Sequence, residues 1–379
     1  MRSFEQRIET LGLAARHEQD CGAERGAERL AGGVYHSVAA GRRVSLLKVL
    51  QSTHCSGQCH YCAIRASRDV ARAALSPDEM ARHFLDLRRA GVVEGLFLSS
   101  GIHGRPDRAM ERMIATAEVV RRSGFRGYVH LKILPGTSDA AVERAVTLAD
   151  RVSVNLEAPT DAALARLSPG KQLEGQILGP LRSAARIARQ QGKRAAVTTQ
   201  FVVGAAGETD AELLGRATAL YDERLVSRCY FSPFAPPADG PFAGMTPAPR
   251  LRMVRLYQAD WLLRYYGFSL REIPLGPAGL LDQYSDPKTV WARGHPAEFP
   301  VEVNRAARAE LLRVPGIGPA GADRIVRARR SARVRSPGDL GSLGVRWRVA
   351  APYLTFDGRR FRSSVAQPEL PGIEPRAGS

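Results

Sequence analysis

The feature that most constrains the fold of this chain is a regular alternation of strand-like and helix-like segments between residues 44 and 266. Six short apolar runs are each followed by a segment with helical periodicity. Parallel neighbouring strands need a crossover, which is usually a helix, so the alternation predicts a parallel sheet covered by helices. The predicted strands are 44–53, 95–100, 128–134, 151–157, 196–204 and 228–234, and the predicted helices are 77–89, 106–122, 138–149, 160–167, 174–190, 208–223 and 248–266.

A loop with three cysteines follows the first predicted strand, reading HCSGQCHYC over residues 54–62. Both a doubly wound sheet and a barrel fit the alternation, and in both, ligands bind at the carboxyl ends of the strands, where this loop begins. Thiolates favour zinc, copper(I) and iron–sulfur clusters. His54 or His60 could complete a Cys3His zinc site, although structural zinc sites usually pair two knuckles and the sequence has no second one. On a four-iron cluster, Cys55, Cys59 and Cys62 would leave one iron open.

The C-x3-C-x2-C spacing, with the aromatic Tyr61 before the third cysteine, resembles the signature of the radical S-adenosylmethionine (SAM) superfamily. The resemblance covers roughly residues 40–295 and implies a partial (β/α)6 TIM-like barrel. It implies that Cys55, Cys59 and Cys62 ligate a 4Fe–4S cluster whose open iron binds SAM. It also implies reductive cleavage of SAM to a 5′-deoxyadenosyl radical, with an electron donor such as flavodoxin or ferredoxin as partner.

The same resemblance implies a set of SAM contacts at the strand ends. Where the family has a Gly-Gly-Glu-like motif after the second strand, this chain has Ser-Ser-Gly, so the acidic residue is missing. Alternate residues at the end of the fourth strand share one face, as ribose or carboxylate contacts require. The fifth strand leads into a stretch ending at Glu208 that matches the family's adenine-packing motif loosely. The expected cofactor-binding residues are Tyr61, Ser99, Ser100, Gly101, Lys132, Ser153, Asn155, Glu157 and Val203.

Two strands carry further candidate functional side chains. His130 and Lys132 share a face of the third strand and could meet a carboxylate or a phosphate. Cys229, on the sixth strand, is the candidate catalytic residue, as a hydrogen-atom donor to a substrate radical. The alternative is that Cys229 is a buried structural cysteine, because free cysteine is among the most buried residue types. Auxiliary clusters would need more cysteines than Cys229 and Cys21.

After Trp291 the alternation stops, and LLRVPGIGPAGADRIVRARR (311–330) has the form of a helix-hairpin-helix motif. Its glycines permit a turn with outward N–H groups next to a helix N-terminus, which can hold a phosphate without reading a base. The predicted small core is Leu312, Val314, Ile317, Ala322, Ile325 and Val326, and the predicted DNA contacts are Arg313, Pro315, Gly316, Ile317, Gly318, Arg324 and Arg327. Residues 339–345 resemble a degenerate second hairpin. The alternative is a structural or protein-binding hairpin.

The charge of the chain supports a polyanionic partner. It has 55 basic and 38 acidic side chains, a formal charge of +17, and residues 301–379 carry 15 arginines against 7 acidic residues. We therefore expect binding to DNA backbone phosphates that is independent of sequence and steeply dependent on salt. No run approaches the ~18 apolar residues of a membrane span, so we expect a cytoplasmic protein without membrane contact.

The expected organisation is an N-terminal leader (1–40), the partial barrel (41–295), a small all-α helix-hairpin-helix domain (296–362) and a disordered tail (363–379). This combination resembles a bacterial group of radical SAM proteins described as acting in DNA modification or repair. The leading hypothesis is an enzyme that performs radical chemistry on DNA held by its tail. The alternatives are an RNA-modifying radical SAM enzyme and a non-catalytic iron–sulfur module that senses redox state on DNA.

Overall fold

The computed structural model describes residues 2–15, 33–39, 42–193 and 196–361. The predicted leader therefore lies partly outside the described residues, and Cys21 and the predicted tail lie entirely outside them. The chain divides into two compact units. The first unit comprises Met1–Asp260 and Leu275–Gln283, and the second comprises Trp261–Pro274 and Tyr284–Ser379. Within the described ranges, no helix has the length and apolar character needed to cross a bilayer.

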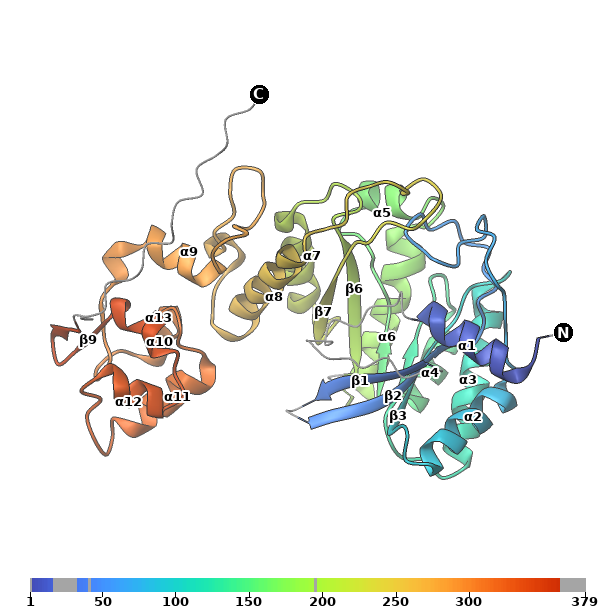
Figure 1. The fold of residues 1–379 in the computed structure, drawn as a ribbon, viewed down its shortest axis with the longest axis horizontal. Helices are drawn as coiled ribbons and strands as arrows, with labels where there is room; N and C mark the ends of the chain where they lie inside the picture. The colour runs from blue at the N-terminus through green and yellow to red at the C-terminus, as the bar shows by residue number, and fades with distance from the viewer. Residues whose placement is uncertain (1, 16–32, 40–41, 194–195, 362–379) are drawn as a thin grey trace. The chain divides into compact units, whose positions relative to one another are not determined.

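The first unit is built on a seven-stranded sheet whose strands are neighbours in the order in which they occur along the chain (Figure 1). Six of them pair in parallel, which confirms the predicted series of strands, and the sequential order is that of a partial barrel. A doubly wound sheet would reverse its strand order at a switch point, so that alternative is wrong. The parallel strands are β2 (Arg42–Leu50), β3 (Gly95–Ser99), β4 (Val129–Lys132), β5 (Arg151–Ser153), β6 (Val197–Val203) and β7 (Arg228–Pro233).

The predicted leader contains structure that the periodicity did not reveal. Residues Phe4–Ala15 form helix α1, which buries Leu11, and residues Val34–Ala39 form strand β1, antiparallel to β2. The expectation of an irregular or partly helical leader thus missed an edge strand. A six-residue strand among Gly-rich flanks is too short for an alternating pattern to distinguish it from a loop.

Helices follow each parallel strand, as the alternation predicts. Their starts are set by local signals: Ser76 and Glu79 form the predicted capping box of the first of them, with Pro77 at its first position. The buried faces of these helices pack on the sheet. The helices are α2 (Pro77–Arg89), α3 (Pro106–Arg122), α4 (Asp139–Leu148), α5 (Asp161–Leu167), the π-helical turn Leu173–Leu178, α6 (Gly179–Gln190), α7 (Asp210–Asp222) and α8 (Arg250–Tyr265).

The second unit has its own core, which includes all of the hairpin residues predicted to be buried, with Val326 only partly so. It is not all-α as expected, because three short strands form a small sheet. Strands of two or three residues are too short to show an alternating apolar pattern in the sequence. The elements are the end of α8, 3₁₀ turns at 270–272, 296–298 and 351–353, α9 (Pro287–Gly294), β8 (Val301–Glu302), α10 (Arg308–Arg313), α11 (Pro319–Ala328), α12 (Pro337–Ser342), α13 (Trp347–Ala350), β9 (Leu354–Phe356) and β10 (Arg359–Arg360).

The boundary between the units also differs from the one expected at residue 295. The second unit already begins at Trp261, within α8. Aromatic packing explains the difference: the rings of Phe268 and Trp291 lie 5.2 Å apart, and Phe299 packs against the second core. Residues 261–274 and 284–295 therefore belong to the second unit, although they follow the last strand of the barrel without a composition change.

A buried lysine ties α9 to the glycine turn of the second unit. Lys288 is 6% exposed, its Nζ donates to the Ile317 carbonyl oxygen at 2.6 Å, and the same nitrogen lies 4.6 Å from the centre of the Tyr266 ring. Burial lowers the pKa of Lys288 to about 7, although the Asp286 carboxylate opposes the shift. The neutral amine still donates its hydrogen bond, so the turn stays anchored above that pH.

This pKa predicts a pH-dependent stability of the second unit. The folded state releases the Lys288 proton near pH 7 and the unfolded state near pH 10.5, so the charged lysine destabilises the fold below pH 7 and this cost disappears as the pH rises. The unfolding free energy of the wild type relative to Lys288→Met should increase by up to ~1.4 kcal/mol per pH unit above pH 7. All three tryptophans lie in the second unit, so tryptophan fluorescence during urea unfolding measures it selectively. A difference independent of pH would contradict the assignment, and Arg348→Met is the exposed control.

Candidate functional site

The residues predicted to bind the cofactors follow the carboxyl ends of five parallel strands. The cysteine loop follows β2, Ser99 ends β3 and Ser100–Gly101 follow it, Lys132 ends β4, Asn155–Glu157 follow β5, and residues 204–208 follow β6. Because parallel strands end at the same edge of a sheet, the fold gathers these segments at one edge of the partial barrel. This is the edge at which such folds bind ligands.

The three cysteines of the loop after β2 lie close to one another. All three are half-buried and none forms a disulfide. A Cβ atom on Gly57 would lie 3.4 Å from the Cys55 sulfur and 3.8 Å from the Cys59 sulfur, so the glycine leaves the space between these thiols open. Burial, with the nearby Cys59 thiol, raises the pKa of Cys62 to about 12. Three neighbouring thiols on one loop fit a cluster bound through three cysteines.

The loop is held by an arginine that sequence reasoning missed. Arg72 donates to the carbonyl oxygens of residues 53, 64, 65 and 68, at 2.7 to 3.0 Å. The segment after β3 supports the loop from the other side, because Gly101 donates its N–H to the Ser52 carbonyl oxygen at 2.7 Å. A Cβ on Gly101 would lie 2.5 Å from the carbonyl oxygen of His54, so only glycine fits there. Gly101 is thus a packing residue for the cysteine loop.

Neither histidine of the motif completes a zinc site. The His60 Nδ1 atom lies 2.8 Å from the Arg166 carbonyl oxygen, and the His54 ring lies against His103 at 6.1 Å. Among the described residues, no group of three or more His, Cys, Asp or Glu side chains is gathered tightly enough for a single metal ion. A four-iron cluster differs, because each thiolate bonds a different iron. The geometry therefore disfavours the Cys3His alternative.

Glu157 connects the cysteine loop to the segment after α5. Its carboxylate accepts two hydrogen bonds from Lys171 Nζ, at 2.8 and 2.9 Å, and one from Ser168 at 3.1 Å. The Tyr61 hydroxyl also bonds it, and Lys171 bonds the Cys59 thiol. Burial alone would raise the pKa of Glu157, but the Lys171 ammonium outweighs burial and lowers it. Glu157 thus stays ionised at neutral pH.

The backbone of Glu157 is in the left-handed region, with φ of 69°. This conformation is uncommon for residues other than glycine and is concentrated at functional sites. The sequence contained no signal for Lys171 or Ser168, which lie in a Pro-Gly turn far from the cysteines. The carboxylate predicted to contact SAM directly is instead engaged with protein groups, so we describe Glu157 as a residue that positions Tyr61 and Lys171.

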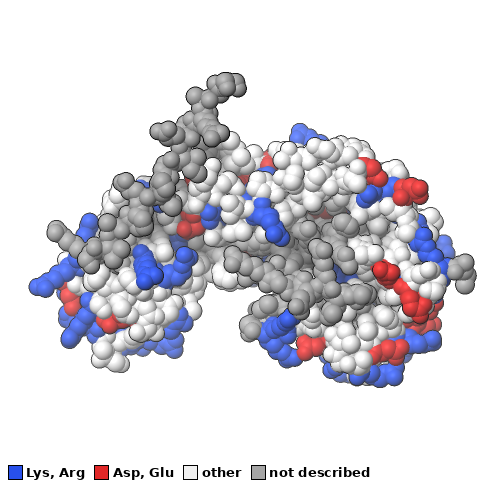
Figure 2. All heavy atoms as spheres, in the orientation of Figure 1, with Lys and Arg blue, Asp and Glu red and all other residues white. Residues whose placement is uncertain are grey.

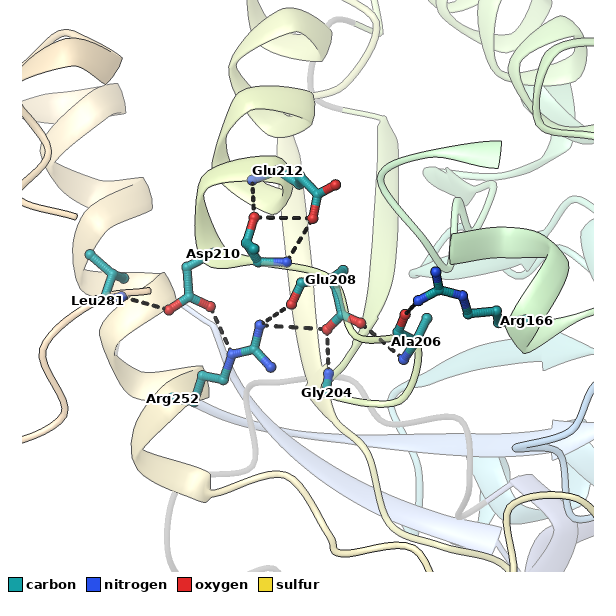
Figure 3. Close-up of polar contacts among 9 residues, drawn as sticks. Arg166, Gly204, Ala206, Glu208, Asp210, Glu212, Arg252 and Leu281 are labelled. Atoms are coloured by element: carbon teal, nitrogen blue, oxygen red, sulfur yellow. Dashed lines mark hydrogen bonds and ion pairs between the residues drawn. The ribbon is translucent and has the colours of Figure 1, made fainter. Parts of the chain in front are cut away.

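The loop after β6 is fixed by a buried network of charges (Figure 3). The Glu208 carboxylate accepts the N–H groups of Gly204 and of Ala206, the latter at 3.0 Å. Arg252, from α8, donates to the Glu208 carbonyl oxygen at 2.6 Å and to the Asp210 carboxylate at 2.8 Å. Val203, predicted to bind the cofactor, is buried directly before this loop. The network gives the loop one conformation, which suits a surface against which a flat ring packs.

The other predicted contacts fall into two groups. Ser99 and Ser100 are buried, and the Ser100 hydroxyl donates to the Gly101 carbonyl oxygen at 2.9 Å. Lys132, Ser153 and Asn155 line a small cavity on one face of the sheet. The structure thus brings the second group together, as the alternation of residues along the strands predicts.

Cys229 is the candidate hydrogen-atom donor. This residue is fully buried, and its backbone N–H donates to the Tyr221 hydroxyl of α7 at 2.9 Å. The next residue, Tyr230, lines the cavity. Successive side chains of a strand point to opposite faces, so Cys229 points away from the cavity toward the helices. This placement favours the alternative, a buried structural cysteine.

The sequence matches one family model, that of the radical SAM superfamily, over residues 49–217. This stretch spans β2 to α7 and includes the cysteine loop, so residues 49–217 form a radical SAM superfamily domain. Members of this superfamily are enzymes that use a 4Fe–4S cluster and SAM. A search of curated proteins finds no match to the sequence.

Solved structures of related fold include methylornithine synthase (PylB), with 19% identity, a TM-score of 0.47, and coverage of 59% of this chain and 63% of that one. The hydrogenase maturase HydG from Carboxydothermus hydrogenoformans has 13% identity and a TM-score of 0.45, covering 56% of this chain and 50% of the maturase. Native anSMEcpe with bound AdoMet has 14% identity and a TM-score of 0.37, covering 58% and 60%. The chain thus spans about half to three fifths of the length of these structures. The family match, rather than these likenesses, carries the assignment.

The network after β6 yields a prediction for stability. Arg252→Met should destabilise the first unit by ~3–5 kcal/mol, because it leaves the buried carboxylates of Asp210 and Glu208 without their cation. The matched control is Arg144→Met, which removes an exposed ion pair with Glu118 and should cost less than ~1 kcal/mol. Urea unfolding followed by circular dichroism measures both. Equal losses in the two variants would show that the network does not depend on Arg252.

Proposed function

We propose that this chain is a radical SAM enzyme in which Cys55, Cys59 and Cys62 hold a 4Fe–4S cluster, and that its substrate is DNA bound by the second unit. The observation that carries the first part is the gathering of three thiols on one loop, within the domain that matches the superfamily. When bound, the cluster and SAM supply an organic radical by one-electron cleavage of SAM.

In this proposal, residues of the chain hold the cysteine loop in place and shield the reaction site from solvent. Arg72 fixes the cysteine loop through four carbonyl oxygens, and Glu157 orients Tyr61 and Lys171 beside the thiols. On the other side of the loop, Asp239 forms ion pairs with Arg65 at 2.6 Å and with Arg68 at 2.8 Å. These contacts fasten the segment after β7 against the cysteine loop, which supports a role of that segment in keeping solvent from the site.

For the second unit, we propose that α10, the turn 314–318 and α11 act as a helix-hairpin-helix that binds phosphate. Gly316 has φ of +83°, and a Cβ there would lie 2.8 Å from the carbonyl oxygen of Arg346. Gly316 also accepts the N–H of Arg346 at 3.3 Å, which joins the first turn to the segment between α12 and α13. The N-terminus of α11, with Ala320 exposed, provides N–H groups and the positive end of a helix dipole.

The arginines of this unit divide into internal and external ones. Arg324 donates to the carbonyl oxygens of Leu343 and Gly344, and Arg313 pairs with Glu272 at 2.7 Å while lying 4.0 Å from the centre of the Phe268 ring. These two side chains serve the fold, so their predicted DNA contacts do not enter the proposal. Arg327 remains in it. The exposed arginines from residue 301 onward are Arg305, Arg308, Arg327, Arg330, Arg333, Arg335, Arg346, Arg348, Arg359 and Arg360.

Charge distribution supports a polyanion as partner. In Figure 2 the atoms of Lys and Arg far outnumber those of Asp and Glu over the part of the chain that Figure 1 shows as α10 to α13. A base inside a duplex cannot enter a barrel, so the proposal requires a flipped base or single-stranded DNA. The RNA-modifying enzyme and the redox-sensing module remain the competing functions. Equal turnover on tRNA would favour the former, and absence of SAM cleavage by an intact cluster would favour the latter.

The first test separates the two parts of the proposal. With dithionite, SAM and reconstituted iron–sulfur protein under anaerobic conditions, the wild type should form 5′-deoxyadenosine, and DNA should stimulate its formation. Cys55→Ala should abolish this product, because one of three cluster ligands is lost, and should leave the dissociation constant for DNA unchanged within twofold. Loss of both activities in this variant would contradict the division into two parts. Cys229→Ala is the matched control and should retain both.

A second test addresses the hairpin. Ala320→Glu places a negative charge in the first turn of α11, where it favours the helix but repels a bound phosphate. We expect DNA affinity to fall about tenfold and the slope of log K against log salt to decrease by ~0.9, the loss of one phosphate contact. Ala309→Glu makes the same charge change at the exposed start of α10 and serves as control. If the two variants bind DNA equally well, the turn is not the contact.

A further inference from the structure

A small cavity on one face of the sheet is lined by side chains from β4 and β6 and from β5 and its extension. Those that can contact a ligand through polar atoms include His130, Lys132, Ser153, Asn155, Thr198 and Gln200. Phe97 and Tyr230 add aromatic walls. The lining contains a lysine and no carboxylate, so its composition favours a ligand that bears negative charge.

One hydroxyl in this lining lacks a hydrogen-bond partner among the described residues. Thr198 is 1% exposed, and its Oγ1 atom is buried without a donor or acceptor in reach. The neighbouring Thr199 is different, because its hydroxyl donates to the Val154 carbonyl oxygen at 2.7 Å and accepts the Leu156 N–H at 3.1 Å. A buried hydroxyl without a partner costs ~1–3 kcal/mol, and such groups in folded proteins usually mark a bound water, ion or ligand.

Positive groups surround the cavity beyond its own lining. Lys48 is 6% exposed and lies 5.2 Å from the centre of the Phe97 ring, and Arg151 is paired with His130 across β4 and β5. The His130 ring stacks on Phe97 with centroids 4.2 Å apart, and its Nε2 atom lies 2.9 Å from the Ser153 hydroxyl.

These surroundings also set the charge of His130 itself. Burial and the neighbouring cations lower the pKa of His130 well below its ordinary value. The ring is therefore neutral at pH 7 and can share a hydrogen bond with Ser153. The basic side chains near the cavity are Lys132, Lys48 and Arg151.

We propose that this cavity is an oxyanion subsite that binds a phosphate or carboxylate group of the substrate, with the Thr198 hydroxyl as hydrogen-bond donor and Lys132 as the charge partner. A good hydrogen bond to a charged group contributes more than one between neutral groups, which would offset the cost of the buried hydroxyl. The inference rests on the proposed function only for the identity of the substrate. The subsite itself can be measured without cluster, SAM cleavage or DNA.

The test uses the full-length protein and compares thymidine 5′-monophosphate with thymidine, which differ by the phosphate, in isothermal titration. The wild type should bind the monophosphate at least tenfold more tightly. Thr198→Val keeps the shape but removes the hydroxyl, so it should lower affinity for the monophosphate about tenfold while leaving the melting temperature unchanged or higher. Thr199→Val is the matched control: it should lower the melting temperature because it breaks backbone contacts, and it should keep the affinity.

Several outcomes would overturn the inference. Unchanged monophosphate affinity in Thr198→Val would show that the hydroxyl does not face the anion, and a lower melting temperature would show that it is already hydrogen-bonded in the free protein. Lys132→Met should also weaken monophosphate binding at least tenfold. Its affinity tests the subsite even if the Thr198 variant gives no interpretable result. Failure of both acetate and inorganic phosphate to compete with the monophosphate would show that the cavity does not bind an oxyanion. Competition by SAM would assign the cavity to the cofactor and refute a substrate subsite. A protein that binds the anion as expected but never cleaves SAM would refute the proposed function alone.

Discussion

The parallel pairing of β2 to β7 is the constraint from which the site follows, because it delivers five loops to one edge of one sheet. Loops at such an edge carry backbone groups that the strands no longer satisfy. Here two charged side chains satisfy several of them: Arg72 donates to carbonyl oxygens of the cysteine loop, and Glu208 accepts N–H groups of the loop after β6. Lys171, from the segment after α5, holds the Glu157 carboxylate that follows β5.

The extent to which the fold could be predicted depended on the length of each element. The six parallel strands and their helices were predictable because apolar periodicity over ten or more residues, and caps such as Ser76 with Glu79, are local signals. Strands β1, β8, β9 and β10 are too short for this and depend on partners distant in the chain. The boundary within α8 was missed for a related reason, since the packing of Trp291 on Phe268 leaves no mark in the sequence.

The part of the candidate site whose residue types are set by ligand chemistry could be predicted from the sequence. The part whose residue types are set by packing could not. The spacing of Cys55, Cys59 and Cys62 is a local requirement of a shared ligand. Strand alternation groups Ser153 with Asn155 on one face. The same rule places Cys229 on the helix side of β7. The internal roles of Arg313 and Arg324 were not predictable, because an arginine in a basic helix looks the same whether its partner is a phosphate or a carbonyl oxygen of the same unit.

The division of the chain also affects how its two units can be inherited. The backbone passes between them three times, after Asp260, Pro274 and Gln283, so neither unit is a single uninterrupted stretch. A domain added by simple gene fusion would be linked to the rest of the chain by a single backbone connection. Here the loss of either unit by truncation would remove a piece of the other, and α8 would be cut in its middle. Neither unit can therefore be removed intact by cutting the backbone at a single point.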